Sequence, residues 1–242
     1  EPVHQAGNDA IGASAIWVIR EDRAGRIWVG SDGGLDRFDP RTGAWTNFAY
    51  RRDVPGLPGP GVRDWLELGN GGFLVATSSG LAMIDAHDRV SPIAYARPGP
   101  NEALSRTINA MRRDRNGRLW LATYDGLQVL DPDYRWLHTV EHPDLPRGLV
   151  RDLLMQPDGR LWVAAARLCR IDTRAERLDA VQPTCFGAEA GLPEDGIQAI
   201  EAGSDGALWA SSLQGLYRLA PEQSEAQSFF VGSGLVSDEF GP

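Results

Sequence analysis

One position in a repeated unit carries side chains able to bind a small polar ligand. It directly follows a β-branched residue that keeps a constant place in every unit, and it holds large, mostly polar groups while the framework around it stays apolar. Arginine donates paired hydrogen bonds to carboxylates, and aromatic rings stack on sugars, so this position predicts a site for a sugar or a carboxylated ligand. The residues are Trp17, Arg63, Asn109, Arg151 and Gln198.

A second group of polar and aromatic residues lies in the loops between the second and third strands expected in each unit. These loops are predicted to open on the same face as the first group, around a central channel. The simpler interpretation is that both groups solvate loop tips, or that Arg63 and Arg151 pair with the adjacent Asp64 and Asp152. The loop residues are Asp32, Ser78, Ser79, Tyr124, Asp125, Arg167 and Gln214.

Several kinds of catalysis are excluded by residue type. All 24 basic residues are arginines, which excludes a lysine nucleophile, a Schiff-base lysine and a phosphate-loop lysine. Serine-nucleophile elbows of the G-x-S-x-G type and glycine-rich phosphate loops are absent from the sequence. We therefore expect no cofactor.

The histidines and aspartates do not predict a metal site either. The four histidines are expected on the outer rim, away from the channel mouth, so these units lack an acid–base histidine there. His138 and His142 have only Glu141 and Asp144 nearby as further ligands. Aspartates that stand singly in hairpin turns are expected to cap those turns rather than to bind calcium. They are Asp22, Asp114, Asp158 and Asp205.

The two cysteines are expected to be free and buried. Cys169 falls in the third strand of the fourth unit, where a short hairpin would place a residue near Ala180 opposite it. Cys185 then lies about five residues out of register, beyond the reach of a disulfide at roughly 3.3 Å per residue.

The repeat that positions these residues is defined by a tryptophan anchor. The Trp28 position recurs with spacings of 46, 46, 42 and 47 residues, and a β-branched residue stands 12 positions before every anchor. The tryptophans are predicted to be core residues rather than ligand contacts. The anchors are Trp28, Leu74, Trp120, Trp162 and Trp209, and the β-branched residues are Ile16, Val62, Ile108, Val150 and Ile197.

Each unit is predicted to form four strands, as residues 16–21, 26–31, 34–39 and 44–50 illustrate. Four strands per period of about 40–45 residues are typical of a β-propeller blade. A β-sandwich would not keep a fixed tryptophan anchor, and solenoid repeats are shorter. The predicted fold is an all-β propeller with five readable blades, cut from a longer propeller of about seven.

We expect five blades flanked by two partial ones. Residues 1–15 are assigned to the tail of a preceding blade, because Val3 lies 13 residues before Ile16 as Tyr95 lies 13 before Ile108. Phe240 is expected to start a next blade. We therefore expect the segment to associate with a second copy, or its tails to pack over the open faces of the end blades. The blades are 16–61, 62–107, 108–149, 150–196 and 197–239, with 240–242 beginning the next.

The unit from Ile16 to Pro40 resembles the two-component regulator propeller repeat, and the segments beginning at Gly191 and Gly234 are similar to its opening linker. The resemblance implies the extracytoplasmic sensor region of a bacterial hybrid histidine kinase or diguanylate cyclase. It also implies further blades, an immunoglobulin-like domain, a membrane helix and a cytoplasmic signalling domain outside these residues. Streptogramin lyases have a similar unit and provide an enzymatic alternative.

Composition agrees with a globular, extracytoplasmic domain. Of the 242 residues, 42% are hydrophobic and 24% are charged, which is too apolar for disorder. The net charge of −9 disfavours nucleic acid or an anionic membrane as a partner. No apolar run is long enough to span a bilayer, and a start at Glu1 suggests a piece of a longer, membrane-anchored protein.

The function predicted from these observations is ligand sensing in the periplasm, without catalysis in this segment. The expected partners are a small molecule, with carbohydrate as the candidate class, and a second copy of the chain. Two alternatives stay open. One is a lyase-like propeller with its catalytic residues outside this segment, and the other is a propeller that serves only dimerisation or protein interaction.

Overall fold

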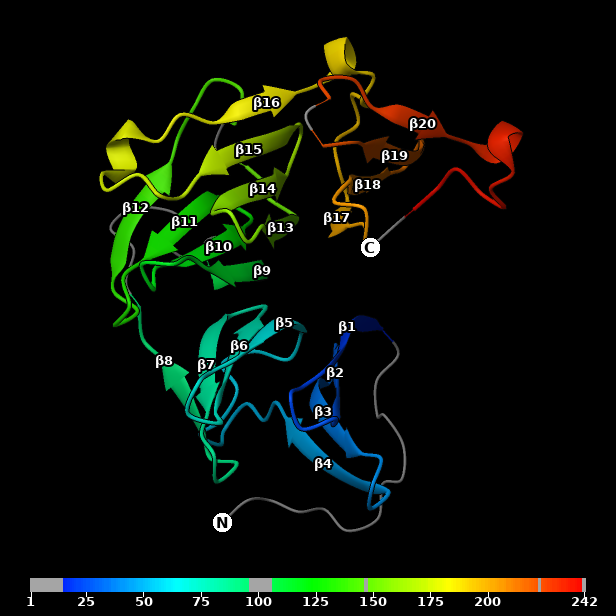
Figure 1. The fold of residues 1–242 in the computed structure, drawn as a ribbon. Helices are drawn as coiled ribbons and strands as arrows, with labels where there is room; N and C mark the ends of the chain where they lie inside the picture. Colours follow the sequence, from blue (N-terminus) through cyan, green and yellow to red (C-terminus); the bar gives the residue numbers. More distant parts are fainter. Residues whose placement is uncertain (1–14, 96–105, 146–147, 222, 241–242) are drawn as a thin grey trace. The chain divides into compact units, whose positions relative to one another are not determined.

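The computed structural model describes residues 15–95, 106–145, 148–221 and 223–240. Their twenty strands form five four-stranded sheets, each with its strands in sequence order (Figure 1). The architecture is that of a β-propeller, as the repeat predicts, and each sheet is one blade. The expected tail of a preceding blade, residues 1–14, lies outside the described residues.

Blades 1 and 2 belong to the first of two compact units, residues 1–111. Blade 1 contains β1 (Ile16–Glu21), β2 (Ile27–Ser31), β3 (Gly34–Asp39) and β4 (Ala44–Ala49). Blade 2 contains β5 (Val62–Glu67), β6 (Phe73–Thr77), β7 (Gly80–Ile84) and β8 (Val90–Ile93).

The boundary between the units falls within β9 of blade 3, and blades 4 and 5 belong to the second unit, residues 112–242. Blade 3 contains β9 (Ile108–Arg113), β10 (Leu119–Thr123), β11 (Gly126–Leu130) and β12 (Trp136–Val140). Blade 4 contains β13 (Asp152–Met155), β14 (Arg160–Ala164), β15 (Leu168–Asp172) and β16 (Thr184–Phe186). Blade 5 contains β17 (Ala199–Ala202), β18 (Leu208–Ser212), β19 (Gly215–Leu219) and β20 (Gln227–Phe229). Short 3₁₀ helices lie outside the strands, at Leu178–Ala180, Ala188–Ala190 and Val231–Ser233.

Three of the four tryptophan anchors, Trp28, Trp120 and Trp162, are buried core residues as predicted, whereas Trp209 is half-buried. Trp28 is fully buried, and its ring centroid lies 4.3 Å from that of Phe73 and 5.7 Å from that of Trp65, both in blade 2. In the second unit, Trp162 of blade 4 packs in one apolar cluster with Ile197 of blade 5. Trp28 and Trp162 therefore contribute to the contact between their own blade and the next.

Turn aspartates hold the anchors in place. The Asp22 carboxylate accepts hydrogen bonds from the backbone N–H groups of Ala24 and Arg26 and from the Trp28 indole N–H at 2.7 Å. Asp114 caps the matching turn of blade 3 and accepts from the Trp120 indole at 2.9 Å. The predicted turn-capping role of these aspartates is confirmed.

A second kind of aspartate joins successive blades. Asp64 in β5 is buried and accepts hydrogen bonds from Arg20 Nη1 in blade 1 and from the Met111 N–H in blade 3, the latter at 2.8 Å. Asp152 in β13 accepts from the Ile200 N–H at 3.0 Å and lies 3.8 Å from Arg112 Nη2. Both carboxylates thus link the preceding and following blades.

The expectation of two free cysteines is wrong. Cys169 and Cys185 form a disulfide, and they stand directly opposite each other where β15 pairs with β16. The expectation requires a short hairpin, but the connection between these strands runs from residue 173 to residue 183 and includes a 3₁₀ helix. The longer connection shifts the register so that the two cysteines meet.

Replacing Asp22 with alanine should destabilise the fold in a pH-dependent way. Burial raises the pKa of Asp22, but hydrogen bonds from Trp28 and Arg26 outweigh it and hold the pKa below the usual 3.8. Because the folded pKa is the lower one, the carboxylate stabilises fully above pH 3.8 and loses this effect as the pH falls through the folded value. Thermal unfolding from pH 7 to pH 2.5 should show the difference from wild type, about 2 kcal/mol at pH 7, shrinking toward acid. Gln156→Ala, at the matching turn of blade 4, is the control and should show no such pH dependence.

Replacing Asp64 with alanine should lower the free energy of unfolding by about 2–3 kcal/mol, because the Met111 N–H loses a charged acceptor inside the protein. Urea unfolding of Asp64→Ala and of the exposed control Asp53→Ala measures the difference. The control should stay within about 0.5 kcal/mol of wild type. Equal stability of the two variants would contradict the linking role of Asp64.

Candidate functional site

In blades 1 and 2, the predicted ligand position lies in a β-bulge at the start of the first, inner strand. The pairing of β1 with β2 shifts between Ile16 and Val18, and that of β5 with β6 shifts between Val62 and Asp64. The residues inside these shifts are Trp17 and Arg63. A bulge turns a side chain out of the regular alternation of a strand, so the backbone itself singles out these two residues.

Three of the predicted residues contact one another across blades 1, 2 and 3. The Arg63 guanidinium carbon lies 4.4 Å from the centroid of the Trp17 ring, and Arg63 Nη1 donates a hydrogen bond to Asn109 Oδ1 at 3.3 Å. All three side chains are half-buried. We call Trp17, Arg63 and Asn109 the bulge row.

The bulge row retains unused hydrogen-bond donors. Within the described residues, neither Arg63 Nε nor Trp17 Nε1 has an acceptor, although both atoms are shielded from water. Trp17 and Asn109 are uncharged, so neither of them neutralises the positive charge of Arg63. The row therefore suits a ligand group that only accepts hydrogen bonds, such as a carboxylate.

The equivalent residues of blades 4 and 5 are placed differently. Arg151 and Gln198 are half-buried, and their backbone N–H groups donate to Ala164 O and Ser211 O, each at 2.8 Å. In the part of the chain that the structure describes, no hydrogen bond joins these two side chains to each other. The three contacting residues of the row come from blades 1, 2 and 3.

The loops between second and third strands lie at the same end of the blades as the bulges. Ile16 pairs with Ser31 and Val62 pairs with Thr77, which brings the start of each inner strand beside the loop that follows its neighbour. Four of the predicted loop residues are exposed there, whereas Ser78 and Asp125 are half-buried. The exposed residues are Asp32, Ser79, Tyr124 and Gln214.

Hydroxyl groups shape these loops. The Thr123 hydroxyl donates to Gly126 O at 2.8 Å and accepts from the Asp125 N–H, and Ser31 and Thr77 repeat the arrangement. Gly126 has a φ of 104°, a conformation that favours glycine. Blade 4 departs from this pattern because Ala165 stands where blade 3 has Thr123, and no glycine lies between Ala165 and Leu168.

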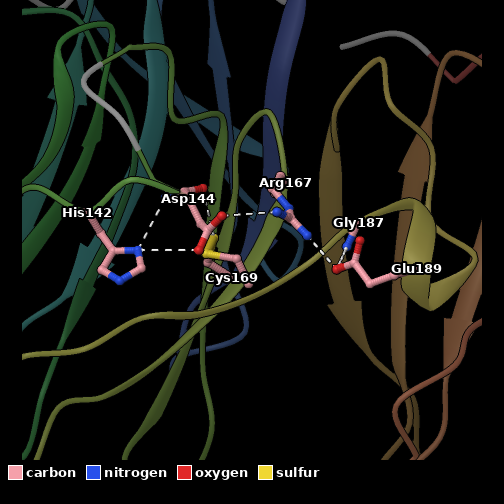
Figure 2. Close-up of a disulfide and its surroundings, with 7 residues drawn as sticks. His142, Asp144, Arg167, Cys169, Gly187 and Glu189 are labelled. Carbon is pink, nitrogen blue, oxygen red and sulfur yellow. Dashed lines mark hydrogen bonds and ion pairs between the residues drawn. A yellow bond between two sulfur atoms is a disulfide. The ribbon is translucent and has the colours of Figure 1, made fainter.

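Arg167, another predicted ligand residue, is held by two carboxylates in this irregular loop (Figure 2). Its Nη1 lies 3.0 Å from Asp144 Oδ1, and its Nη2 donates to Glu189 Oε1. The Glu189 carboxylate accepts from its own backbone N–H, from the Gly187 N–H and from Arg167, which lowers its pKa. Two acidic partners compensate the Arg167 charge, so this residue is a weaker candidate for binding an anion than Arg63.

The disulfide lies next to this cluster (Figure 2). Cys169 Sγ lies 3.8 Å from the backbone oxygen of Asp144, and the His142 ring Nδ1 accepts from the Asp144 N–H at 3.2 Å. Sequence reasoning missed Asp144 and Glu189 as partners of Arg167, because they come from two connections that do not follow the repeat.

The described residues contain no group of three or more His, Cys, Asp or Glu side chains arranged to hold a metal ion. Among the same residues there is no helix with the length and apolar character needed to cross a membrane.

Comparison with known proteins agrees with the predicted repeat. The family model described as two component regulator propeller matches residues 11–33 and 104–125. The two matches fall on the first and third units, which carry the repeat most clearly. No curated protein matches. The chain thus contains two-component regulator propeller repeats on a β-propeller fold.

Solved structures share this fold at low sequence identity. The extracellular domain assigned to a hybrid two-component system of B. thetaiotaomicron superposes with a TM-score of 0.73 at 19% identity, over 89% of this chain and 31% of the other. A second such domain from that organism gives 0.67 at 17% identity, over 98% and 37%. Virginiamycin B lyase from Staphylococcus aureus gives 0.68 at 16% identity, over 89% and 69%. The chain spans about a third of the length of the two-component structures.

Removing the disulfide should destabilise blade 4. Because the cysteines are 16 positions apart in the sequence, the chain-entropy model predicts a loss of about 3 kcal/mol. Calorimetry with and without dithiothreitol should show a lower Tm for the reduced wild type. The double variant Cys169→Ala, Cys185→Ala is the control, and its Tm should not respond to the reductant. A wild-type Tm that is unchanged although thiol titration shows full reduction would contradict the prediction.

Proposed function

We propose that the chain is a ligand-sensing propeller from the extracytoplasmic part of a bacterial membrane signalling protein, a hybrid histidine kinase or a diguanylate cyclase. The two-component regulator repeats and the likeness to extracellular domains of hybrid two-component systems support this proposal. The Cys169–Cys185 disulfide also favours an oxidising compartment such as the periplasm.

The bulge row is the observation that carries the proposed ligand site. A carboxylate placed against Arg63 receives charge-assisted hydrogen bonds from the guanidinium, which its stacking on Trp17 and its bond to Asn109 hold in one orientation. A uronic acid combines such a carboxylate with a sugar ring. We therefore propose an acidic carbohydrate as the ligand class.

The same contacts suggest how binding is reported. Arg63 touches a residue of blade 1 and a residue of blade 3. A ligand that draws the guanidinium toward itself changes both contacts, and hence the relation between the three blades. The shift then acts on the geometry of a dimer and, through an anchor outside this chain, on a cytoplasmic domain.

A lyase-like enzyme is the second candidate, favoured by the superposition on virginiamycin B lyase. The two candidates differ at the histidines. His138 lies in β12, and His142 lies beside Asp144 in the connection to blade 4. The bulge row itself contains no histidine, so catalysis there requires an acid–base residue from elsewhere.

Replacing Arg63 with methionine should abolish most binding of acidic sugars. Isothermal titration against galacturonate, glucuronate and N-acetylneuraminate, with galactose and glucose as neutral probes, is the measurement. The affinity for the acidic sugar that binds wild type should fall about 10- to 100-fold, since a charged hydrogen bond contributes about 1.5–3 kcal/mol.

The matched control is Arg52→Met, which removes an exposed arginine from a loop and should leave the affinity unchanged. Binding of an acidic sugar that is equally strong in Arg63→Met would contradict the site. Binding of neutral sugars alone would contradict the ligand class, and binding of no sugar at all would contradict a carbohydrate ligand.

A further inference from the structure

The connections that leave blades 4 and 5 carry the same structural element. In each, the last strand leads into a short 3₁₀ helix and then into a glycine with a positive φ, 72° and 102°, and an aspartate follows four residues later. The N–H of the leucine after this glycine donates in both elements to the carbonyl of the residue before the helix, at 3.1 Å and 3.3 Å. The backbone therefore places the residues of the two elements alike. The equivalent pairs are Gly187 and Phe230, Ala188 and Val231, Glu189 and Gly232, Gly191 and Gly234, and Asp195 and Asp238.

The two aspartates differ in their partners. Asp238 Oδ1 accepts a hydrogen bond from the N–H of Val231, the first residue of its 3₁₀ helix. Both carboxylate oxygens of Asp195 are shielded from water, and neither accepts a hydrogen bond in the part of the chain that the structure describes. Removing a carboxylate from water without giving it donors costs free energy. Asp195 is therefore an acceptor without a donor, and the donor equivalent to that of Asp238 is the Ala188 N–H.

Glu189 accepts hydrogen bonds at the start of the blade 4 helix instead (Figure 2). Its Oε1 accepts from the Gly187 N–H at 2.9 Å and from Arg167 Nη2. Blade 5 has Gly232 in place of this glutamate, and its loop between the second and third strands, residues 213–214, contains no arginine. The glutamate and the arginine thus occur together in blade 4, and the aspartate bonds to the helix in blade 5, where both are missing.

The contact between Arg167 and Glu189 is of a kind that a ligand can replace. The Glu189 side chain is 64% exposed and that of Arg167 is 33% exposed, and exposed ion pairs contribute little to stability. Arg167 Nε is shielded from water and has no acceptor among the described residues. A carboxylate can accept two parallel hydrogen bonds from a guanidinium, so a carboxylate ligand suits this side chain.

We propose that Arg167 belongs to an anion-binding site that Glu189 blocks. A ligand carboxylate takes the place of Glu189 on the guanidinium, and Asp195 then accepts a hydrogen bond from the Ala188 N–H, as Asp238 does from the Val231 N–H. The exchange gives a donor to a carboxylate that is shielded from water, which compensates for the contact that Glu189 loses. The site shares no residue with the bulge row and does not rest on the ligand class proposed there.

Hydrogen exchange at the Ala188 amide tests the change of acceptor. The protection factor of this amide should be at least about 10-fold higher in Glu189→Ala than in wild type, because Asp195 then accepts from it. The gain should disappear in the double variant Glu189→Ala, Asp195→Ala. The Val231 amide of blade 5 is the internal reference. It should be protected in all three proteins and lose its protection in Asp238→Ala.

An NMR titration with sodium acetate at constant ionic strength tests the anion site. The Arg167 Nε–Hε signal should report an acetate affinity about 5-fold higher in Glu189→Ala than in wild type, since an exposed ion pair contributes up to about 1 kcal/mol. Glu194→Ala removes an exposed glutamate of the same connection and is the matched control. It should leave both the acetate affinity and the Ala188 amide unchanged.

Each readout can overturn the proposal by itself. An acetate affinity at Arg167 that is equal in wild type and Glu189→Ala would show that Glu189 does not block the site. An Ala188 amide that exchanges equally fast in both proteins would show that Asp195 does not replace Glu189. The Arg63 Nε–Hε signal reports the bulge row in the same titration, so failure of that site and failure of this one are distinguishable.

Discussion

The structure depends on covering the inner strand of each blade with the blade before it. This strand is the edge of its sheet, so its apolar side chains and half of its N–H groups find no partner within the blade. The preceding anchor covers the side chains, as Trp28 covers Trp65. At every second blade, a carboxylate also accepts a hydrogen bond from a backbone N–H group of the next blade's inner strand, as Asp64 accepts from the Met111 N–H. Because Asp64 accepts hydrogen bonds from Arg20 of the preceding blade and from the Met111 N–H of the following one, its carboxylate connects three consecutive blades.

This constraint also explains where a binding site can form. Val62 must point into the contact between blades, so the residues on either side of it have little freedom along a regular strand. The bulge inserts Arg63 between Val62 and Asp64 and frees that one side chain from packing. The framework can therefore stay constant while the inserted residue changes from Trp17 in blade 1 to Arg63 in blade 2.

The sequence predicts those features that the repeat imposes on every blade. The constant distance from Ile16 to Trp28 is enough to predict the four strands and the buried anchor, and the turn aspartates follow from their place before glycine. The bulge was not predictable, because it arises from strand pairing. The Cys169–Cys185 disulfide was also missed, since the connection after β15 is longer than the repeat suggests. Asp144 and Glu189 reach Arg167 from similarly irregular connections.

Charge compensation separates the two arginines that the sequence treated alike. Arg167 lies between two carboxylates, and among the described residues its charge is matched within the protein. Arg63 instead contacts an indole ring and an amide oxygen, which orient the guanidinium without neutralising it. Arg63 therefore keeps an oriented positive charge in a chain whose net charge is −9. The guanidinium of Arg63, which the fold has already oriented, can neutralise the charge of a bound anion. The bulge row is therefore a stronger candidate site than the loop of blade 4.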